Sequence, residues 1–273
     1  MKKKFGIIGN PIEHSLSPVL HNYWFKKYKI DGEYQLINVN ENELSKIVKG
    51  LKNKDFHGIN VTLPYKQKIV PHLDILVNDA KATSSVNTLY LDEKGTIIGE
   101  NTDVFGLQAA YLKEVDNISK KTALIIGAGG VSPSVILSLQ KSGVKNVSII
   151  NRTKEKCFFL KKKFKTLKIV DWSEIKDEIK KHDLIINATS LGLKNGNDFN
   201  FSFDDVKKTL IYIDTIYNPL ETKTIKYLKE KETKVFNGLE MFIYQGQKSF
   251  YLWNKINPEI DQNLIELLLS KLK

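Results

Sequence analysis

The chain has 273 residues, 41% of them hydrophobic and 27% charged, which is typical of a folded globular protein with room for two modest domains. No stretch reaches the roughly 18 apolar residues that a membrane-spanning helix needs, and the run Phe5–Ile8 is too short for the core of a signal peptide. The single cysteine, Cys157, excludes an internal disulfide and argues against a metal cluster. We therefore expect a cytoplasmic protein with no bound metal and no membrane partner.

A net charge of +11 makes a nucleic-acid-binding protein the main alternative of a different class. The lysines are spread along the whole chain, however, instead of being gathered with aromatic residues into one stripe. The short cluster Lys161-Lys162-Lys163 falls in a predicted helix and is interpreted as a solvated face. The charge therefore indicates attraction of small anionic ligands, and no nucleic-acid partner is expected.

The first part of the chain alternates short apolar runs with amphipathic stretches, which is typical of α/β units around a parallel sheet. Ser17 followed by Pro18 predicts the start of a helix, with Ser17 as its N-cap. The turn Asp92-Glu93-Lys94-Gly95 predicts a β-hairpin between the runs on either side of it. The predicted strands are 5–9, 34–39, 57–62, 86–91 and 96–98, and a helix is predicted over 41–51.

A second series of strands and helices begins at the apolar run 122–126. Further strands are predicted over 147–150, 168–170, 184–187, 210–214 and 234–236, with helices between most of them, the first over 131–141. Two helices, at about 240–253 and 258–272, close the chain without strand partners. We predict an α/β protein whose N-terminal α/β domain, 1–103, is completed by C-terminal helices of 239–273 that pack back on it, and whose second domain, 104–238, is doubly wound and Rossmann-type.

A glycine-rich turn, Gly127-Ala128-Gly129-Gly130, joins the strand 122–126 to the next helix. Such a turn lets backbone N–H groups approach a pyrophosphate at the helix N-terminus. Ser132 stands in place of the third glycine of the usual fingerprint, and Pro133 suits the first helical turn. By itself the motif is equally compatible with a tight structural turn.

The only arginine of the chain, Arg152, follows the next strand, roughly 20 residues on, where a Rossmann domain places the group that reads the adenosine ribose. NAD enzymes have Asp or Glu there, whereas this chain has Asn151-Arg152-Thr153, with Lys156 one turn later. A guanidinium binds phosphate and stacks on adenine, which lysine does poorly. A surface ion pair would not explain why lysine was not used. The position therefore favours NADP over NAD.

Polar side chains follow successive strands of the first domain, at the edge where α/β proteins usually bind ligands. They lie in the segments Asn10–Pro18, Asn60–Lys66, Asn87-Thr88 and Asn101–Asp103. If they are paired in a cleft, Lys66 and Asp103 form a proton-transfer couple in which the carboxylate orients the ammonium. Each of these residues taken singly is compatible with a turn or a cap. The whole set is less compatible with turns and caps, because hydroxyl, amide, lysine and carboxylate groups recur at successive strand ends, and it predicts a site for a small polar substrate.

These motifs resemble, in order, those of the shikimate dehydrogenases, and the resemblance extends over essentially the whole chain. In the first domain it is carried by Ser15-Leu16-Ser17-Pro18 with His21-Asn22, Asn60-Val61-Thr62 through Lys66, Asn87, and Asn101-Thr102-Asp103. In the second domain it is carried by Asn151-Arg152-Thr153, Asn187–Gly192, Tyr217-Asn218-Pro219 and Asn237–Met241, followed by Gln245.

The resemblance implies the interconversion of 3-dehydroshikimate and shikimate with NADPH, a step of chorismate and aromatic amino-acid biosynthesis. It implies Lys66 and Asp103 as the catalytic residues, and as substrate-binding residues Ser15, Ser17, Asn60, Thr62, Asn87, Tyr217 and Gln245. The cofactor-binding residues it implies are Gly127, Ala128, Gly129, Gly130, Val131, Asn151, Arg152, Thr153, Lys156, Thr189, Ser190, Thr215, Gly238 and Met241. The protein could be a monomer or a homodimer.

Two departures from the family pattern stand out: the loop end Ser132-Pro133-Ser134, which should change packing more than binding, and Asn78, where some relatives have an acidic cofactor contact. Several alternatives stay open. A quinate-accepting branch would share the fold, but its NAD-using members should carry an acidic ribose reader. The serine pair beside Lys66 and Asp103 argues against a methylene-tetrahydrofolate dehydrogenase. A non-catalytic sensor of NADP and a shikimate-like ligand would not need the Lys66–Asp103 couple.

Overall fold

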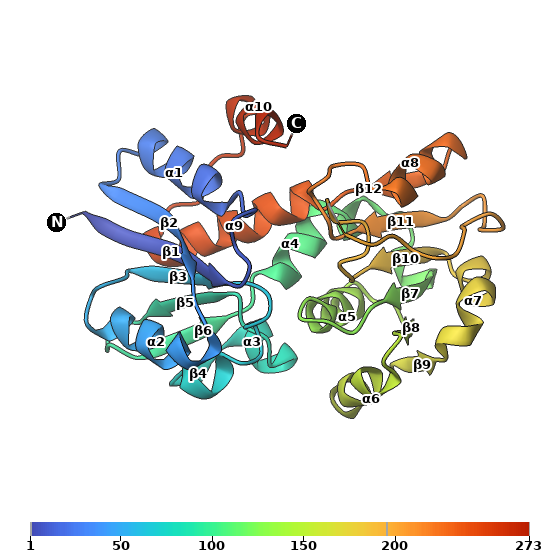
Figure 1. Ribbon diagram of the computed structural model, residues 1–273, viewed down its shortest axis with the longest axis horizontal. Coiled ribbons are helices and arrows are strands. Elements are labelled where there is room, and N and C mark those ends of the chain that lie inside the picture. The colour runs from blue at the N-terminus through green and yellow to red at the C-terminus, as the bar shows by residue number, and fades with distance from the viewer. Residues whose placement is uncertain (1, 195, 273) are drawn as a thin grey trace. The chain divides into compact units, whose positions relative to one another are not determined.

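In the computed structural model, residues 2–194 and 196–272 are described, and the chain divides into two compact units (Figure 1). The first unit comprises Met1–Gly106 and Ile243–Lys273, and the second comprises Leu107–Phe242. Both divisions fall inside helices, α4 (Asp103–Ala110) and α9 (Leu239–Asn254). The sequence analysis placed the boundaries a few residues earlier, after residues 103 and 238.

A six-stranded sheet forms the centre of the first unit, in the order β2-β1-β3-β5-β6-β4. Its strands are β1 (Lys3–Gly9), β2 (Gly32–Asn38), β3 (Gly58–Val61), β4 (Ile75–Leu76), β5 (Thr88–Leu91) and β6 (Ile97–Glu100). Only β5 runs antiparallel to its neighbours, and with β6 it forms the predicted hairpin. The two-residue strand β4 was not predicted, because so short a run carries no periodicity.

The helices of the first unit include one that was not predicted, over 78–83, and three whose starts differ from the prediction. Those present are α1 (Ser17–Lys27), α2 (Leu44–Lys52), α3 (Asn78–Thr83), most of α9, and α10 (Gln262–Ser270), with a 3-10 turn at Glu41–Glu43 before α2. Ser17 is not an N-cap: Leu16 holds that position, and Ser17 lies buried in the first turn. α10 begins at Gln262 and not near Pro258, because Asp261 caps it by accepting from Leu264 N at 2.8 Å.

The C-terminal segment packs against α1, as predicted for the closing helices. Trp24 is fully buried, and its indole N–H donates to the Glu259 carbonyl at 3.0 Å. Lys27 forms ion pairs with Glu259 and Asp261, and the Tyr23 hydroxyl donates to the Asp261 carboxylate at 2.8 Å. These contacts tie the end of the chain to the helix that follows the serine motif.

A buried histidine, His21, lies in the aromatic core between α1 and α9. Its ring stacks on Tyr34 with centroids 4.4 Å apart and is close to Trp253 and Phe250. Both ring nitrogens are buried without a hydrogen-bond partner, and burial lowers the pKa of His21 to about 3. The ring is therefore neutral in the folded protein at neutral and mildly acidic pH.

Acid is expected to destabilise the first unit through this ring. The unfolded chain protonates His21 below its ordinary pKa of 6.5, whereas the folded protein does so only near about 3, so unfolding takes up a proton between these values. The free energy of unfolding should fall by about 1.4 kcal/mol per pH unit in that window. In thermal melts, His21→Phe should lose less stability than wild type between pH 7.5 and 5.5. The exposed His14→Gln serves as the control, and equal losses for His21→Phe and wild type would contradict the expectation.

The second unit has the doubly wound architecture that the glycine loop predicts. Its six parallel strands follow the order β12-β11-β10-β7-β8-β9, the strand order of a Rossmann sheet. They are β7 (Thr122–Ile126), β8 (Asn146–Ile150), β9 (Lys168–Val170), β10 (Leu184–Asn187), β11 (Ile211–Asp214) and β12 (Lys234–Phe236). The chain reverses its direction of winding between β7 and β10, so ligands are expected beyond the carboxyl ends of these two strands.

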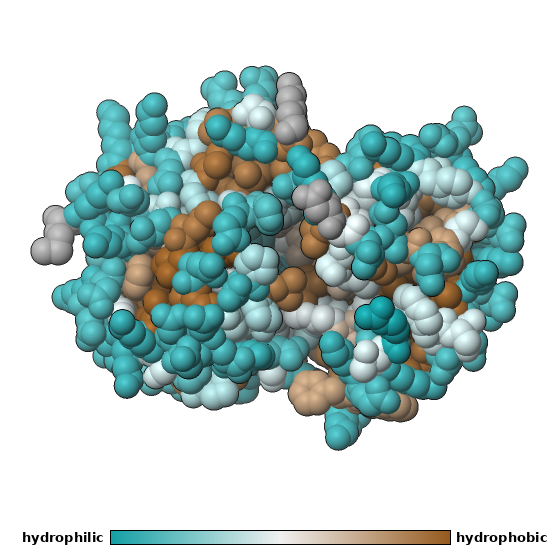
Figure 2. Space-filling view, viewed as in Figure 1, coloured by the Kyte–Doolittle hydropathy of each residue, from teal (hydrophilic) through white to brown (hydrophobic). Residues whose placement is uncertain are grey.

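Four helices accompany this sheet: α5 (Ser132–Lys141), α6 (Lys154–Lys163), α7 (Ile175–Lys181) and α8 (Lys223–Glu230). In its described residues, the connection from β10 to β11 contains no helix. Phe199, Phe201 and Phe203 pack against the core there, with Phe203 on Tyr212. Lys161-Lys162-Lys163 is exposed on α6, as interpreted from the sequence, and hydrophilic side chains cover much of the visible face of each unit (Figure 2).

Candidate active site

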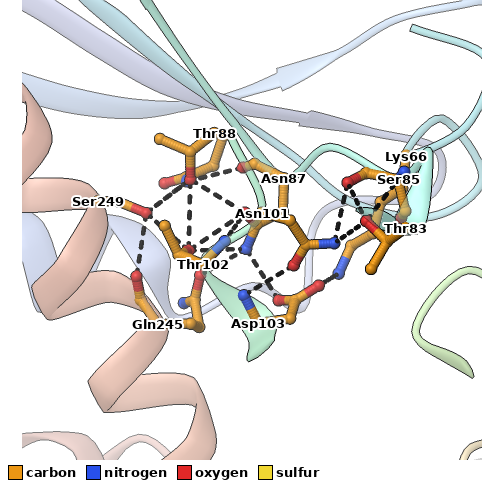
Figure 3. A network of polar contacts seen from close by, with 11 residues as sticks. Lys66, Thr83, Ser85, Asn87, Thr88, Asn101, Thr102, Asp103, Gln245 and Ser249 are labelled. Atoms are coloured by element: carbon orange, nitrogen blue, oxygen red, sulfur yellow. Dashed lines mark hydrogen bonds and ion pairs between the residues drawn. The ribbon is translucent and has the colours of Figure 1, made fainter. Parts of the chain in front are cut away.

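The Lys66 ammonium lies 2.6 Å from a carboxylate oxygen of Asp103, and their side chains are only 12% and 5% exposed (Figure 3). Lys66 lies in the loop after β3, and Asp103 begins α4 directly after β6. The two strands bring residues that are far apart in the sequence to one edge of the sheet. The structure therefore brings together the lysine and the aspartate that the sequence analysis proposed as a proton-transfer couple.

Asn87 holds the other oxygen of the Asp103 carboxylate. Its amide nitrogen donates to Asp103 Oδ1 at 2.8 Å, and its carbonyl oxygen accepts from the Thr102 backbone N–H at 2.8 Å. The Asp103 N–H in turn donates to the side chain of Asn101, whose amide donates to the Ser85 carbonyl. The carboxylate thus has a fixed orientation toward Lys66 (Figure 3).

Gln245 reaches this group from α9, with its carbonyl oxygen 3.2 Å from the Asn87 amide nitrogen. It is half-buried, whereas Asn87 is buried. The structure therefore brings Lys66, Asn87, Asp103 and Gln245 into one network within the first unit.

Three buried hydroxyls lie behind Asn87. Those of Thr88 and Thr102 belong to the polar segments singled out in the sequence, whereas that of Ser249 was not predicted. Ser249 Oγ is 2.8 Å from Thr88 Oγ1 and 3.2 Å from Thr102 Oγ1. Ser249 lies one turn after Gln245 on α9, so it joins that helix to the sheet beneath the candidate site (Figure 3). The only signal in the sequence was a polar residue among the apolar positions of a predicted helix.

Asn60 lies behind the network and not at its surface. Its amide nitrogen donates to the Asn87 carbonyl at 2.9 Å and contacts Ser249, while its oxygen accepts from the Tyr34 hydroxyl at 2.7 Å. Asn60 is only 4% exposed. Its contacts favour a role in positioning Asn87 over direct contact with a substrate.

The predicted serine pair precedes and begins α1. The Ser15 hydroxyl is 3.1 Å from that of Ser17 and also accepts from the Ser17 backbone N–H at 3.3 Å. Thr62, at the end of β3, is half-buried, and its backbone N–H donates to the Ile8 carbonyl. The two serines follow β1 and Thr62 follows β3, and these strands are parallel neighbours in the sheet.

The glycine-rich turn of the second unit has the backbone geometry that its composition predicts. Gly127 has φ +112°, and a β-carbon there would lie 2.8 Å from the Ala188 carbonyl oxygen. A β-carbon on Gly129 would meet only that oxygen, at 3.8 Å, so this stretch leaves room for a group to approach the backbone. Ser132 is buried and donates to the Gly127 carbonyl at 3.0 Å, which stabilises the turn. Gly130 and Val131 lead from the turn into α5.

Arg152 and Lys156 are exposed, and neither forms an ion pair in residues 2–194 and 196–272. The incidental surface ion pair considered for Arg152 is therefore not observed. The neighbouring Asn151 accepts from the Ala128 N–H at 3.1 Å and donates to the Thr153 carbonyl, so it joins the glycine turn to this loop. The arrangement offers two cations beside a phosphate-type turn.

The loops that follow β10, β11 and β12 carry the remaining predicted residues. The Thr189 hydroxyl donates to the side-chain oxygen of Asn187 at 2.7 Å. The Thr215 hydroxyl donates to the backbone carbonyl of Asn187 at 2.8 Å. A β-carbon on Gly238 would lie 2.4 Å from the Thr215 carbonyl oxygen, so only glycine fits. The other predicted residues here are Ser190, which is exposed, Met241, which is buried, and Tyr217, whose ring stacks on Phe242 at 4.7 Å.

No group of three or more His, Cys, Asp or Glu side chains suited to a metal ion occurs among the described residues. In the same part of the chain, no helix is both long and apolar enough to cross a membrane. Cys157 is a buried free thiol, and burial raises its pKa to about 11.

Two family models match the chain. Residues 7–89 match the shikimate dehydrogenase substrate binding domain, and residues 110–214 match the shikimate / quinate 5-dehydrogenase model. A shikimate dehydrogenase (NADP(+)) of Pelagibacter ubique is 44% identical over 268 residues, which cover 98% of this chain and 99% of the relative.

Solved structures agree with these matches. The crystal structure of shikimate dehydrogenase from Aquifex aeolicus is 36% identical with a TM-score of 0.88, covering 100% of this chain and 98% of that one. A structure from Thermus thermophilus, in complex with NADP(H) and shikimate, is 30% identical with a TM-score of 0.87, covering 99% and 100%. On its sequence, fold and side-chain network, the chain belongs to the shikimate dehydrogenase family.

Proposed function

We propose that the protein is an NADP-dependent shikimate dehydrogenase, which reversibly reduces 3-dehydroshikimate to shikimate on the route to chorismate and the aromatic amino acids. The observation that carries the proposal is the buried Lys66–Asp103 pair, 2.6 Å apart, in a member of this family. A relative covering 98% of the chain bears the name shikimate dehydrogenase (NADP(+)). A buried ammonium–carboxylate pair is suited to moving a proton at a developing alkoxide.

The residues present suit NADP. The backbone at Gly129 is open to an approaching group, and the turn leads into the N-terminus of α5, which favours pyrophosphate. Arg152 and Lys156 are exposed cations, and no Asp or Glu stands in the segment Asn151–Lys154 that would repel a 2′-phosphate. When bound, NADPH supplies the hydride for the ring ketone.

The first unit supplies the proton and the orientation. Lys66 donates a proton to the oxygen of the reacting carbonyl and stabilises its negative charge, while Asp103 keeps the ammonium in place. Ser15, Ser17 and Thr62 offer hydroxyls for the substrate carboxylate and ring hydroxyls, with Asn87 and Gln245 beside the lysine. Tyr217 of the second unit is proposed as a further substrate contact.

Two alternatives remain for the same fold: a quinate-accepting or NAD-accepting dehydrogenase, and a sensor that binds NADP and a shikimate-like ligand without reaction. The second matching family model covers both shikimate and quinate enzymes. The intact Lys66–Asp103 pair favours catalysis over sensing, and the exposed Arg152 favours NADP.

One assay separates these functions. Purified protein is mixed with shikimate or quinate and with NADP or NAD, in all four pairings, and absorbance is followed at the nicotinamide band. We expect rapid reduction of NADP with shikimate and much slower reactions in the other pairings. Preferred turnover of quinate with NAD would overturn the substrate and cofactor assignment. Folded protein that is inactive in all four pairings would support the sensor.

We further propose that the protein resides in the cytoplasm, because its buried free thiol suits a reducing compartment. Its oligomeric state is proposed as monomer or homodimer. Light scattering coupled to size-exclusion chromatography distinguishes the two.

A further inference from the structure

Asp214, the last residue of β11, is a fully buried carboxylate that the proposed reaction does not use. No lysine or arginine of the described chain pairs with it. Four neutral groups hold it instead: Ile216 N and Asn187 Nδ2, each 3.1 Å from Oδ1, and the hydroxyls of Thr222 and Tyr212, at 3.0 and 3.4 Å from Oδ2. The carboxylate is thus bound by hydrogen bonds alone.

A buried carboxylate without a cationic partner lowers the free energy of unfolding. Burial raises the pKa of Asp214 to about 6, in spite of the hydrogen bonds from Ile216, Thr222 and Asn187 that favour its charged form. An apolar residue at this strand end would avoid the desolvation cost. The four hydrogen bonds of Asp214 offset part of this cost, and three of the donors lie at the end of β10 or in the loop after β11.

The Oδ1 atom of Asp214 accepts hydrogen bonds from two residues, one at the end of β10 and one in the loop after β11. Asn187, which donates to it, also accepts from the N–H and the hydroxyl of Thr189 at 3.0 and 2.7 Å and donates to the Leu191 carbonyl. The turn after β10 is therefore built on the side chain of Asn187. Ile216, the second donor, follows Thr215 in the loop after β11, and its carbonyl accepts from Gly238 N at 2.7 Å.

The Oδ2 side fixes the far end of the loop after β11. The Thr222 hydroxyl donates to Asp214 and, as the N-cap of α8, accepts from Ile225 N at 3.3 Å. Thr222 also packs against the turn after β10, since a β-carbon on Gly192 would lie 3.0 Å from its methyl group. One carboxylate therefore spans the loops that carry Thr189 and Thr215.

We propose that Asp214 is a positioning residue for the cofactor, which sets the spacing of the loops after β10 and β11 and through them the placement of Thr189, Ser190 and Thr215. The inference rests on the proposed function, because these loops matter only if they hold NADP. The geometry behind it lies entirely in the second unit.

The test compares Asp214→Ala with Asp214→Asn. Alanine leaves the Asn187 amide and the Ile216 N–H without their acceptor, so the loops lose their common anchor. We expect the dissociation constant and the KM for NADP to rise about tenfold, with the KM for shikimate changed less than about threefold. Asparagine keeps an oxygen at the Oδ1 position, and its amide nitrogen can donate to the hydroxyl oxygen of Thr222 from the Oδ2 position. Asp214→Asn should therefore restore NADP binding to within about threefold of wild type.

A matched control is available at the opposite end of the neighbouring strand. Asp183, just before β10, accepts from Thr122 N at 2.9 Å and pairs with Lys207 at 2.6 Å. Asp183→Ala should lower the melting temperature and leave the KM for NADP unchanged. Should Asp214→Ala fail to fold, Thr222→Val removes only the Oδ2 contact and the cap, and should still weaken NADP binding.

Equilibrium NADP binding, measured by calorimetry, keeps this test separate from turnover. If wild type neither binds NADP nor reduces it with shikimate, the proposed function fails. If wild type does both and a folded Asp214→Ala binds NADP as wild type does, only the role of Asp214 is overturned. Impairment of Asp214→Asn equal to that of Asp214→Ala would likewise contradict positioning through hydrogen bonds.

Discussion

Lys66→Ala is expected to lower kcat about 100-fold or more while changing the KM for shikimate only a few-fold. In the proposed reaction the ammonium acts on the reacting oxygen, where charge develops only in the transition state, so its loss should remove little binding of the ground state. The Asp103 carboxylate, only 5% exposed, keeps its contact with Asn87 and cannot replace the missing proton donor.

The neighbouring Lys68 provides a matched control. It lies two residues further on, is exposed, and pairs with Glu41 on the surface. Lys68→Ala should retain wild-type kinetics because surface pairs of this kind contribute little. Melting temperatures and NADP affinity of both variants establish that they are folded. A folded Lys66→Ala enzyme with turnover within a few-fold of wild type would show that another group transfers the proton.

Arg152→Leu is expected to raise the KM for NADP roughly 10- to 150-fold, the effect of losing a charge-assisted contact of about 1.5–3 kcal/mol. The KM for NAD should hardly change, because NAD lacks the 2′-phosphate that the guanidinium would bind. The KM for NADP of Arg152→Lys should lie between those of wild type and Arg152→Leu, because an ammonium supplies the positive charge but not the paired N–H donors of a planar guanidinium. Steady-state kinetics with each cofactor at saturating shikimate measures the preference.

Lys162→Leu controls for the change in net charge and in surface hydrophobicity. Lys162 is exposed on α6, in the lysine cluster of that helix. Its loss removes the same single charge without touching the loop that holds Arg152. A cofactor preference that is equal in Arg152→Leu and in wild type would remove the argument drawn from the lone arginine.

The sequence predicted best where a local rule determines the structure. The run Thr122–Ile126 and the glycines after it are sufficient to predict a strand, a tight turn and a helix, because backbone conformation there depends on residues close in sequence. The same holds for the hairpin of β5 and β6 around its turn. Lys66 and Asp103 were identified from their places after two strands.

Other features depend on tertiary packing and could not be predicted from residues that are close in sequence. In the sequence, Ser249 is one polar position of a predicted helix. Only the fold, in which α9 packs on the sheet, brings its hydroxyl 2.8 Å from that of Thr88. Asn60 looks like a surface group of a motif, yet its neighbours Tyr34 and Ser249 are far away in the sequence and bury it. Asp214 looks like the polar end of a strand, and its role as an anchor emerges only from its contacts with the loops.

The connection between β10 and β11, which contains no helix in its described residues, could not be predicted from the sequence either. A crossover between parallel strands usually contains a helix. Here alternating phenylalanines, Phe199, Phe201 and Phe203, supply the apolar cover in its place. Alternation of this kind is also typical of a strand, so the sequence alone does not distinguish the two.

The first unit is discontinuous in the chain, and this has a consequence for synthesis on the ribosome. Its sheet comes entirely from Met1–Gly106, but Gln245 and Ser249 belong to Ile243–Lys273. The whole of Leu107–Phe242 therefore leaves the ribosome, and can fold, before the buried hydroxyls beneath Asn87 have their last partner. The nascent first unit therefore keeps part of its polar interior exposed until α9 has been synthesised, and only then can Gln245 and Ser249 complete the network around Asn87.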